Sequence, residues 1–389
     1  MERNQKVTET VRKLAPELKE LARFIHDNPE LGMKEYKACE AQTNLLKKYG
    51  FDVTVGVCGF ETAYKAVYRG KKPGPKIAML AEYDALPEIG HACGHNLIAM
   101  VGVGSGIAMR ESADQYGGEI YVIGTPAEET MGAKVAMSEA GIFDEMDVVM
   151  MSHPMDEDRD YMNTMAMKSY RIQYYGKPAH AAAAPEEGIN ALDAAISFFN
   201  MVNALRQQTR EDARLHGIIV NGGSAPNVVP DYTEIIYSAR ANKMAYLETL
   251  TDKVVNCIKA AALGTGCRVE YEKADEDFKD TNSNQVLADL NTRQMEALGV
   301  TVQRSAGKTA TGSSDLGDVS YVCPSIQSNF NICGDDPKGA HTPEFAELAG
   351  TEAAMDRGLL YVEGFVMTAI ELMREPKYLK AIKAEFEKK

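Results

Sequence analysis

The order of hydrophobic and polar residues changes near residue 164. Before that point, short apolar runs such as 119–123 and 148–153 alternate with longer segments of helical periodicity such as 97–110. Short apolar runs bounded by polar residues are typical of buried strands. Strands that alternate with helices predict an α/β domain, in which functional groups collect at the carboxyl ends of the strands.

The block that follows opens with residues 165–175, in which polar and apolar side chains alternate and aromatic residues are frequent. Alternation of this kind predicts a strand. The later patterns predict, in order, a helix from 191 to about 210, strands near 218–221 and 233–241, a helix near 245–263 and a strand at 268–273. This β-α-β-β-α-β order is that of a ferredoxin-like α+β unit.

Length and composition are those of a soluble globular protein with two domains. The chain has 389 residues, of which 45% are hydrophobic and 25% are charged, and a single core is rarely that large. The net charge of −14 argues against a general nucleic-acid surface. No apolar run is long enough to span a bilayer, so we expect no membrane partner.

The cysteines indicate a reducing compartment. Their number, 7, is odd, and no two of them have the spacing of a Cys-x-x-Cys pair. The first residues lead into a charged helix without the apolar core of a signal peptide. We therefore expect free thiols and a cytoplasmic location.

The segment 82–96 carries the densest set of reactive side chains. Within it, Cys93 and His95 are separated by a glycine, which allows both side chains to turn toward one point. A Cys-x-His pair alone is a weak signal, because a buried cysteine beside a polar histidine in a turn has the same appearance.

Ligand-type residues also follow the later strand patterns. Glu128 and Glu129 come after the run 119–123, and His153 ends the next run. One of two adjacent carboxylates can bind a cation while the other holds a water molecule. His341, far downstream, adds a further imidazole. Thiolate, imidazole and carboxylate together suit zinc or a similar divalent ion.

The number of these donors predicts two metal ions rather than one. A catalytic zinc keeps three protein ligands and one open position, whereas Cys93, His95, Glu129, His153 and His341 are five. Because His341 must rejoin ligands that precede residue 154, the block between them is an insertion. We expect a discontinuous catalytic domain, 1–164 plus 280–389, and an inserted domain, 165–279.

Several motifs in order along the chain resemble those of the co-catalytic metallopeptidase and aminoacylase family, peptidase family M20, and of its amidohydrolase branch. They are His26–Gly32, His91–His95, Pro126–Glu129, Gly176–Ala182, Pro226–Pro230 and His341–Pro343. The segments 188–194 and 312–320 are similar to those of aminobenzoyl-glutamate hydrolase and related dipeptidases. Asn96 and Ser314 depart from the wider branch but fit this sub-branch.

The resemblance implies a zinc-peptidase-like α/β catalytic domain with an inserted ferredoxin-like domain that serves as lid and dimerisation surface. It implies that Cys93, His95, Glu129, His153 and His341 are the metal ligands. Glu128 is then the general base, and Asp84 supports a ligand imidazole. A turn-forming or helix-capping aspartate remains the alternative for Asp84.

In the inserted block, the resemblance gives roles to three residues. His180 is expected to enter the active site of the other protomer, bind substrate there and stabilise the oxyanion, although by itself it reads as a loop histidine. Asn227 and Arg240 are expected to hold the substrate, and an arginine suits a carboxylate. A solvated charge at a strand edge is the alternative for Arg240. We expect His26 and His91 to be structural.

The sequence therefore predicts a metal-dependent amide hydrolase that acts on N-acyl amino acids or dipeptide-like substrates. It is expected to be a homodimer with two divalent ions, zinc or manganese, in each protomer. A non-enzymatic metal-binding or regulatory partner of a paralogous hydrolase is the alternative. The exact substrate stays open, because the side chains that line an acyl pocket come from scattered loops.

Overall fold

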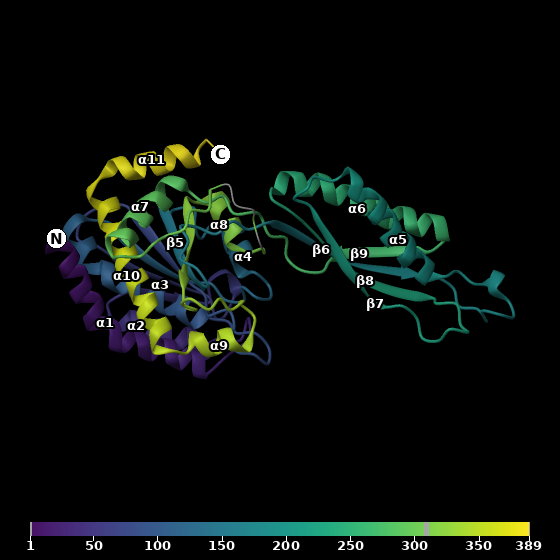
Figure 1. Cartoon of the computed structure of the whole chain (residues 1–389), viewed down its shortest axis with the longest axis horizontal. Coiled ribbons are helices and arrows are strands. Elements are labelled where there is room, and N and C mark those ends of the chain that lie inside the picture. The colour runs from purple at the N-terminus through teal and green to yellow at the C-terminus, as the bar shows by residue number, and fades with distance from the viewer. Residues whose placement is uncertain (1, 307–309, 311, 389) are drawn as a thin grey trace. The chain divides into compact units, whose positions relative to one another are not determined.

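The computed structural model describes residues 2–306, 310 and 312–388, and these form two compact units. The first unit consists of residues 2–163, 281–306 and 318–388, and the second of 164–280, 310 and 312–317. The two are coloured along the chain in Figure 1. Residues 310 and 312–317 pack with the second unit, whereas the sequence-based boundaries placed them with the catalytic domain.

The first unit is built around a six-stranded sheet of order β1-β2-β4-β3-β5-β10. Its strands are β1 Asp52–Val55, β2 Tyr64–Arg69, β3 Lys76–Ala81, β4 Glu119–Gly124, β5 Val148–Met155 and β10 Ser325–Asn331. The four strands from β4 to β10 run parallel, while β1 and β2 are antiparallel additions at one edge. The carboxyl ends of β3, β4, β5 and β10 therefore meet at the same edge of the sheet.

Helices complete the first unit, and Figure 1 shows them around the sheet. They are α1 Glu2–Asp27, α2 Tyr36–Lys48, α3 His95–Tyr116, α4 Ala133–Glu139, α7 Gln285–Ala297, α8 Leu316–Val322, α9 Pro343–Ala349, α10 Glu352–Arg374 and α11 Pro376–Phe386; α8 begins in the last residues of the second unit. β5 is buried almost throughout, as expected for a parallel strand with both faces covered.

Helix α3 is longer than the sequence pattern predicts. The periodicity indicated 97–110, but the helix begins at His95, directly after Gly94 in the left-handed conformation. Asn96 is therefore the second residue of the helix. Its buried amide donates to the carbonyl oxygen of Ala349 at 2.9 Å, which ties α3 to the end of α9.

Glycines let α3 approach its neighbours closely. A Cβ atom on Gly102 would lie 2.4 Å from the carbonyl oxygen of Leu80 in β3. A Cβ on Gly104 would lie 2.8 Å from the Cδ1 atom of Leu18 in α1. The first contact is with backbone and the second with the end of a flexible side chain. Close packing against β3 fixes the position of the helix start, where His95 lies.

The second unit is a four-stranded antiparallel sheet covered by two helices, and its strand order is β7-β8-β6-β9. Its elements are β6 Ala166–Tyr175, α5 Ala191–Leu205, β7 Arg214–Asn221, β8 Tyr232–Ala241, α6 Met244–Thr265 and β9 Arg268–Lys273. Alternate residues of β8 are buried, and α5 and α6 pack on that face (Figure 1). The predicted ferredoxin-like order is confirmed.

All 7 cysteines are free thiols. Among the helices that the structure describes, none combines the length and the apolar character needed to cross a bilayer.

We predict that Gly102→Ala destabilises the protein more than Gly104→Ala. Both changes gain the same intrinsic helix preference, but only the first pushes a methyl group against a backbone carbonyl that cannot rotate away. The expected difference in the free energy of unfolding is about 1–3 kcal/mol. It can be measured by urea unfolding followed by circular dichroism, since the chain has no tryptophan. Equal midpoints for the two variants would contradict the close packing of α3 on β3.

Candidate metal centre

The five predicted ligands come together in the first unit. His95 opens α3, His153 lies near the end of β5, and Glu129 follows β4. His341 arrives from the loop before α9, and its backbone N–H donates to the carbonyl oxygen of Ala92 at 2.8 Å. The fold thus delivers donors from four segments to the carboxyl edge of the sheet.

Donor atoms of these residues form overlapping groups. Cys93, His95 and His153 have one atom each within 4.8 Å of one another, and so do Cys93, Glu129 and His341. Cys93 is common to both groups, so its thiol lies near both sets of donor atoms. His95 and Glu129 form a third group of the same kind with Glu128.

The imidazole of His95 is held by Asp84 with one nitrogen left for another partner. Nδ1 lies 2.8 Å from Oδ1 of Asp84, and both side chains are fully buried. Nε2 is buried without a hydrogen bond among the described residues, 3.5 Å from Oε2 of Glu82 and 3.9 Å from Oε1 of Glu129. A buried ring nitrogen that lies near two carboxylates and lacks a hydrogen bond fits a metal ligand.

His153 is oriented in the same way by the backbone. Its Nδ1 lies 2.8 Å from the carbonyl oxygen of Pro154, and its Nε2 lies 3.4 Å from Sγ of Cys93. The ring of His153 meets the ring of His95 edge to face at 5.9 Å. Both imidazoles therefore present Nε2 to the space beside the thiol.

Two residues of the site adopt a left-handed backbone conformation, which residues other than glycine rarely adopt. They are Ala127, which precedes Glu128 and Glu129, and His341, in the loop before α9. The φ angles are 58° for Ala127 and 67° for His341. Nε2 of His341 lies 3.1 Å from Oε1 of Glu129, and its side chain is about half exposed. Backbone conformations of this kind persist only where the surrounding structure enforces them, and they gather at functional sites.

The pKa shifts reflect a concentration of negative charge. Burial alone raises the pKa of Glu129, but the hydrogen bond from His341 and the charge of His95 lower it to about 2. Burial alone lowers the pKa of His95, but Asp84 and Cys93 raise it well above its ordinary value. Burial raises the pKa of the Cys93 thiol. A divalent cation would favour the deprotonated forms of all three ligands.

Asp84 does not cap a helix. Its second oxygen, Oδ2, accepts the backbone N–H of Glu129 at 2.9 Å. One carboxylate therefore orients the ring of the candidate ligand His95 and the turn that carries Glu128 and Glu129. This arrangement is expected of a group that supports metal ligands.

The structure contains a buried ion pair beside the candidate ligands that the sequence analysis did not predict. Nζ of Lys134, at the start of α4, lies 2.6 Å from Oε1 of Glu82, and both side chains are buried. Glu82 and Asp84 are two residues apart after a strand, a spacing that places both on one face and was a usable signal. No such signal marked Lys134, because a lysine in the first turn of a helix is usually a surface residue.

The structure places His91 and His26 outside the ligand groups. The two rings stack with centroids 6.3 Å apart. Burial, with the charges of His95 and His26, lowers the pKa of His91 to about 3, so its ring is neutral. Nε2 of His26 lies 2.9 Å from the carbonyl oxygen of Ala346, which joins α1 to α9.

The remaining predicted residues lie in the second unit. His180 is exposed, and its Nδ1 accepts the backbone N–H groups of Ala182 and Ala183 at 3.2 Å each, which leaves the proton on Nε2. Asn227 is on the adjoining segment, where its carbonyl oxygen accepts the N–H of Ala181 at 3.0 Å.

The structure excludes the strand-edge alternative for Arg240. This residue lies in β8, which has a neighbouring strand on each side. Nη1 donates to Oγ of Ser313 at 3.2 Å, and Nε is buried without a hydrogen bond among the described residues. Burial lowers the pKa of the guanidinium. A half-buried cation whose Nε lacks an acceptor is suited to an anionic ligand.

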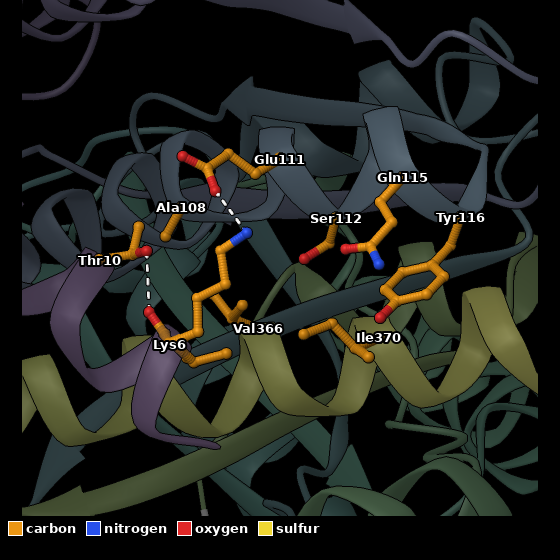
Figure 2. Close-up of a pocket in the computed structure, with 10 residues that line it drawn as sticks. Lys6, Thr10, Ala108, Glu111, Ser112, Gln115, Tyr116, Val366 and Ile370 are labelled. Carbon is orange, nitrogen blue, oxygen red and sulfur yellow. Dashed lines mark hydrogen bonds and ion pairs between the residues drawn. The ribbon is translucent and has the colours of Figure 1, made fainter. Parts of the chain in front are cut away.

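A cavity of about 420 Å³ lies elsewhere in the first unit, between α1, the end of α3, and α10. Figure 2 shows that Lys6 reaches across it to Glu111, with Ser112, Gln115 and Tyr116 beside them. None of the candidate ligands lines this cavity, so we assign it no part in the chemistry.

Comparisons with known proteins agree with the geometry. A family described as the peptidase dimerisation domain of M20 peptidases matches residues 164–265. A mouse protein named Xaa-Arg dipeptidase is 38% identical over 98% of this chain and 91% of its own length. One component of the p-aminobenzoyl-glutamate hydrolase of Escherichia coli is 33% identical over 66% of this chain and 57% of its own.

A solved structure shows the same fold. It is that of a Bacillus subtilis protein described as a dinuclear metal-binding peptidase from the M20 family, with a TM-score of 0.71 and 18% identity over 92% of this chain and 99% of its own. The predicted fold class, a catalytic α/β domain with an inserted domain, is confirmed. Since a relative of 38% identity is matched over nearly its whole length, the chain belongs to the M20 family of peptidases.

Proposed function

We propose that this chain is a two-metal amide hydrolase that cleaves dipeptide-like substrates, with Cys93, His95, Glu129, His153 and His341 as ligands and Glu128 as general base. The observation that carries the proposal is that the donor atoms of these five side chains fall into overlapping groups, one of which contains His95. Nε2 of His95 is buried without a hydrogen bond among the described residues. The donor set suits zinc or manganese.

The chain's own residues perform the proton transfers. When bound, the divalent ions polarise the amide carbonyl and acidify water. Glu128 lies beside Glu129 and His95, takes the proton from the attacking water and returns it to the leaving amine nitrogen. His180 reaches from the other protomer and donates from Nε2 to the oxyanion, and Asp84 holds His95 and the Glu129 turn in place.

Substrate preference is proposed from the second unit and from the relatives. Arg240 and Asn227 suit the carboxylate of a C-terminal residue. The mouse relative, which is matched over 91% of its length, is named for Xaa-Arg dipeptides. We therefore propose that dipeptides with a basic C-terminal residue are better substrates than N-acyl amino acids. The free thiols support a cytoplasmic location.

We also propose a homodimer formed through β7. This strand is the edge of the second sheet, and its Ile218, Ile219 and Val220 are 65%, 40% and 53% exposed. An exposed apolar edge strand is a template for pairing with another chain. The match of residues 164–265 to a dimerisation domain supports this surface as the contact between protomers.

Metal removal tests the activity. Protein treated with a chelator should lose at least about 10²-fold in the hydrolysis of Xaa-Arg dipeptides, and about two equivalents of zinc or manganese per chain should restore it. Liquid chromatography with mass spectrometry on a mixed panel of dipeptides and N-acyl amino acids measures both the loss and the preference. A metal-loaded chain that is inert on the whole panel would favour the regulatory-partner alternative.

Paired substitutions of the acidic residues test the mechanism. Glu128→Gln should lower kcat by about 10²–10⁴-fold, since it removes the proton acceptor, while metal content stays near that of the parent protein. Glu129→Gln, one residue away, should instead lose metal. Metal analysis and steady-state kinetics separate the two. Full turnover by Glu128→Gln would show that the assignment of the base is wrong.

Charge placed on the edge strand tests the dimer. Ile218→Lys should raise the dissociation constant of the dimer by at least about 100-fold, because a symmetric contact receives the ammonium group from both copies. Light scattering after size-exclusion chromatography measures the mass. Leu263→Lys is the matched control, since Leu263 is 86% exposed on α6 of the same unit. Equal masses for both variants would place the interface elsewhere.

A further inference from the structure

The proposed mechanism does not use the motif that joins α1 to α2, although its residues contact both turns that carry the active groups. This connecting segment comprises residues 29–35, Pro29-Glu30-Leu31-Gly32-Met33-Lys34-Glu35. It lies between Asp27, the last residue of α1, and Tyr36, the first of α2.

The first contact is with the turn that follows β3. The carbonyl oxygen of Glu30 accepts the backbone N–H of Ala85 at 2.8 Å, and Leu31 forms a parallel bridge with Ala85. The side chain of Glu30 is anchored in turn, because Oε2 accepts the N–H groups of Lys37 and Ala38 at 2.8 and 3.0 Å. The start of α2 thus holds the backbone next to Asp84.

The second contact is with the turn that follows β4. Oε1 of Glu35 accepts the backbone N–H of Ala127 at 2.8 Å, and Oε2 accepts the hydroxyl of Thr62 at 2.8 Å. The carbonyl oxygen of Thr62 accepts the hydroxyl of Tyr83 at 2.5 Å. Glu35, Thr62, Tyr83 and Ala127 are all buried. A single carboxylate therefore joins α2 to the residue before Glu128.

Two features show that this turn needs an external support. Ala127 has the left-handed φ of 58°, which is unfavourable for an L-residue in isolation. Gly32 packs so closely on the turn that a Cβ there would lie 2.3 Å from Oγ1 of Thr130 and 3.0 Å from the Cα of Ala127. Burial of a carboxyl group is costly and raises the pKa of Glu35, so its retention here calls for a specific role.

We propose that Glu35 is a positioning residue of the active site, and that the hydrogen bond from Ala127 to its carboxylate sets the direction of Glu128 and Glu129. The inference rests on the proposed function for its effect on turnover. Its effect on the conformation of the turn and on metal affinity is independent of substrate.

The test compares three variants of the full chain. Glu35→Met removes both acceptors at similar volume, Glu35→Gln keeps an oxygen for Ala127, and Thr62→Val removes only the other hydrogen bond of the same carboxylate. Three properties are measured: kcat and KM, zinc affinity by competition with a chromophoric chelator, and hydrogen exchange of the peptide that contains Ala127.

We expect Glu35→Met to lower zinc affinity by about 10–100-fold, the range seen when groups that orient ligands are removed. Its kcat should fall by a similar factor, with KM within about 2-fold because no substrate contact is lost, and exchange at Ala127 should become faster. Glu35→Gln should recover most of each property. Thr62→Val should lower the melting temperature but leave zinc affinity and exchange at Ala127 near those of the parent protein.

Two results would overturn the proposal. One is parental zinc affinity and slow exchange at Ala127 in folded Glu35→Met, and the other is an equal loss in Glu35→Met and Thr62→Val. If Glu35→Met does not fold, Gly32→Ala displaces the same turn by direct contact with Thr130 and Ala127 and should give the same pattern. Failure of the proposed hydrolysis would appear as an inert parent protein, whereas zinc affinity and exchange still decide the role of Glu35.

Discussion

The two hydrogen bonds of the buried Asp84 carboxylate are the interaction on which the geometry of the candidate metal centre depends. One oxygen lies against Nδ1 of His95 and the other accepts the N–H of Glu129. The strand β3, the helix α3 and the turn after β4 are thereby joined at a single group. Because a carboxylate has two fixed acceptors, a shift of any one of these elements would break a buried, charge-assisted hydrogen bond. The orientation of the candidate ligands is thus a property of the fold.

Charge around the site is arranged in pairs. Glu82 lies against Lys134 in a fully buried pair, and Glu129 lies against His341, which is about half exposed. Isolated charges would be very costly in this environment, and even a paired buried ion contributes little to stability compared with an apolar residue. The buried pair of Glu82 and Lys134 is therefore better explained by chemistry than by folding. The same reasoning applies to Glu35, whose carboxylate supports a left-handed turn next to the acidic pair.

The closely packed helix and strands and the strained turns have different roles in the site. Helix α3 and the parallel strands pack closely, with glycines where the helix meets β3 and α1. Ala127 and His341 lie in turns whose backbone conformation is unfavourable in isolation. The packed elements supply the hydrogen bonds and contacts that hold these turns, so that ligand side chains from distant parts of the sequence meet within a few ångströms.

The order of elements, the ferredoxin-like block and the set of candidate ligands were predictable from the chain alone, because hydrophobic periodicity and ligand chemistry are local properties. The start of α3 at His95 was not, since the left-handed Gly94 that precedes it is a matter of tertiary packing. Periodicity also could not distinguish an interior Arg240 from an edge one. Strand order decides that, and strand order depends on contacts between distant residues.

The partnerships among polar residues, such as Glu82 with Lys134 and Glu35 with Ala127, likewise arise only in the folded molecule. Nothing in the residues adjacent to Lys134 or Glu35 distinguishes them from the many solvated lysines and glutamates of an acidic chain. Their roles follow from burial, and burial is a property of the assembled sheet and helices. The candidate ligands stand out along the chain because thiol and imidazole groups are rare. The residues that contact them do not, because lysine and glutamate are common.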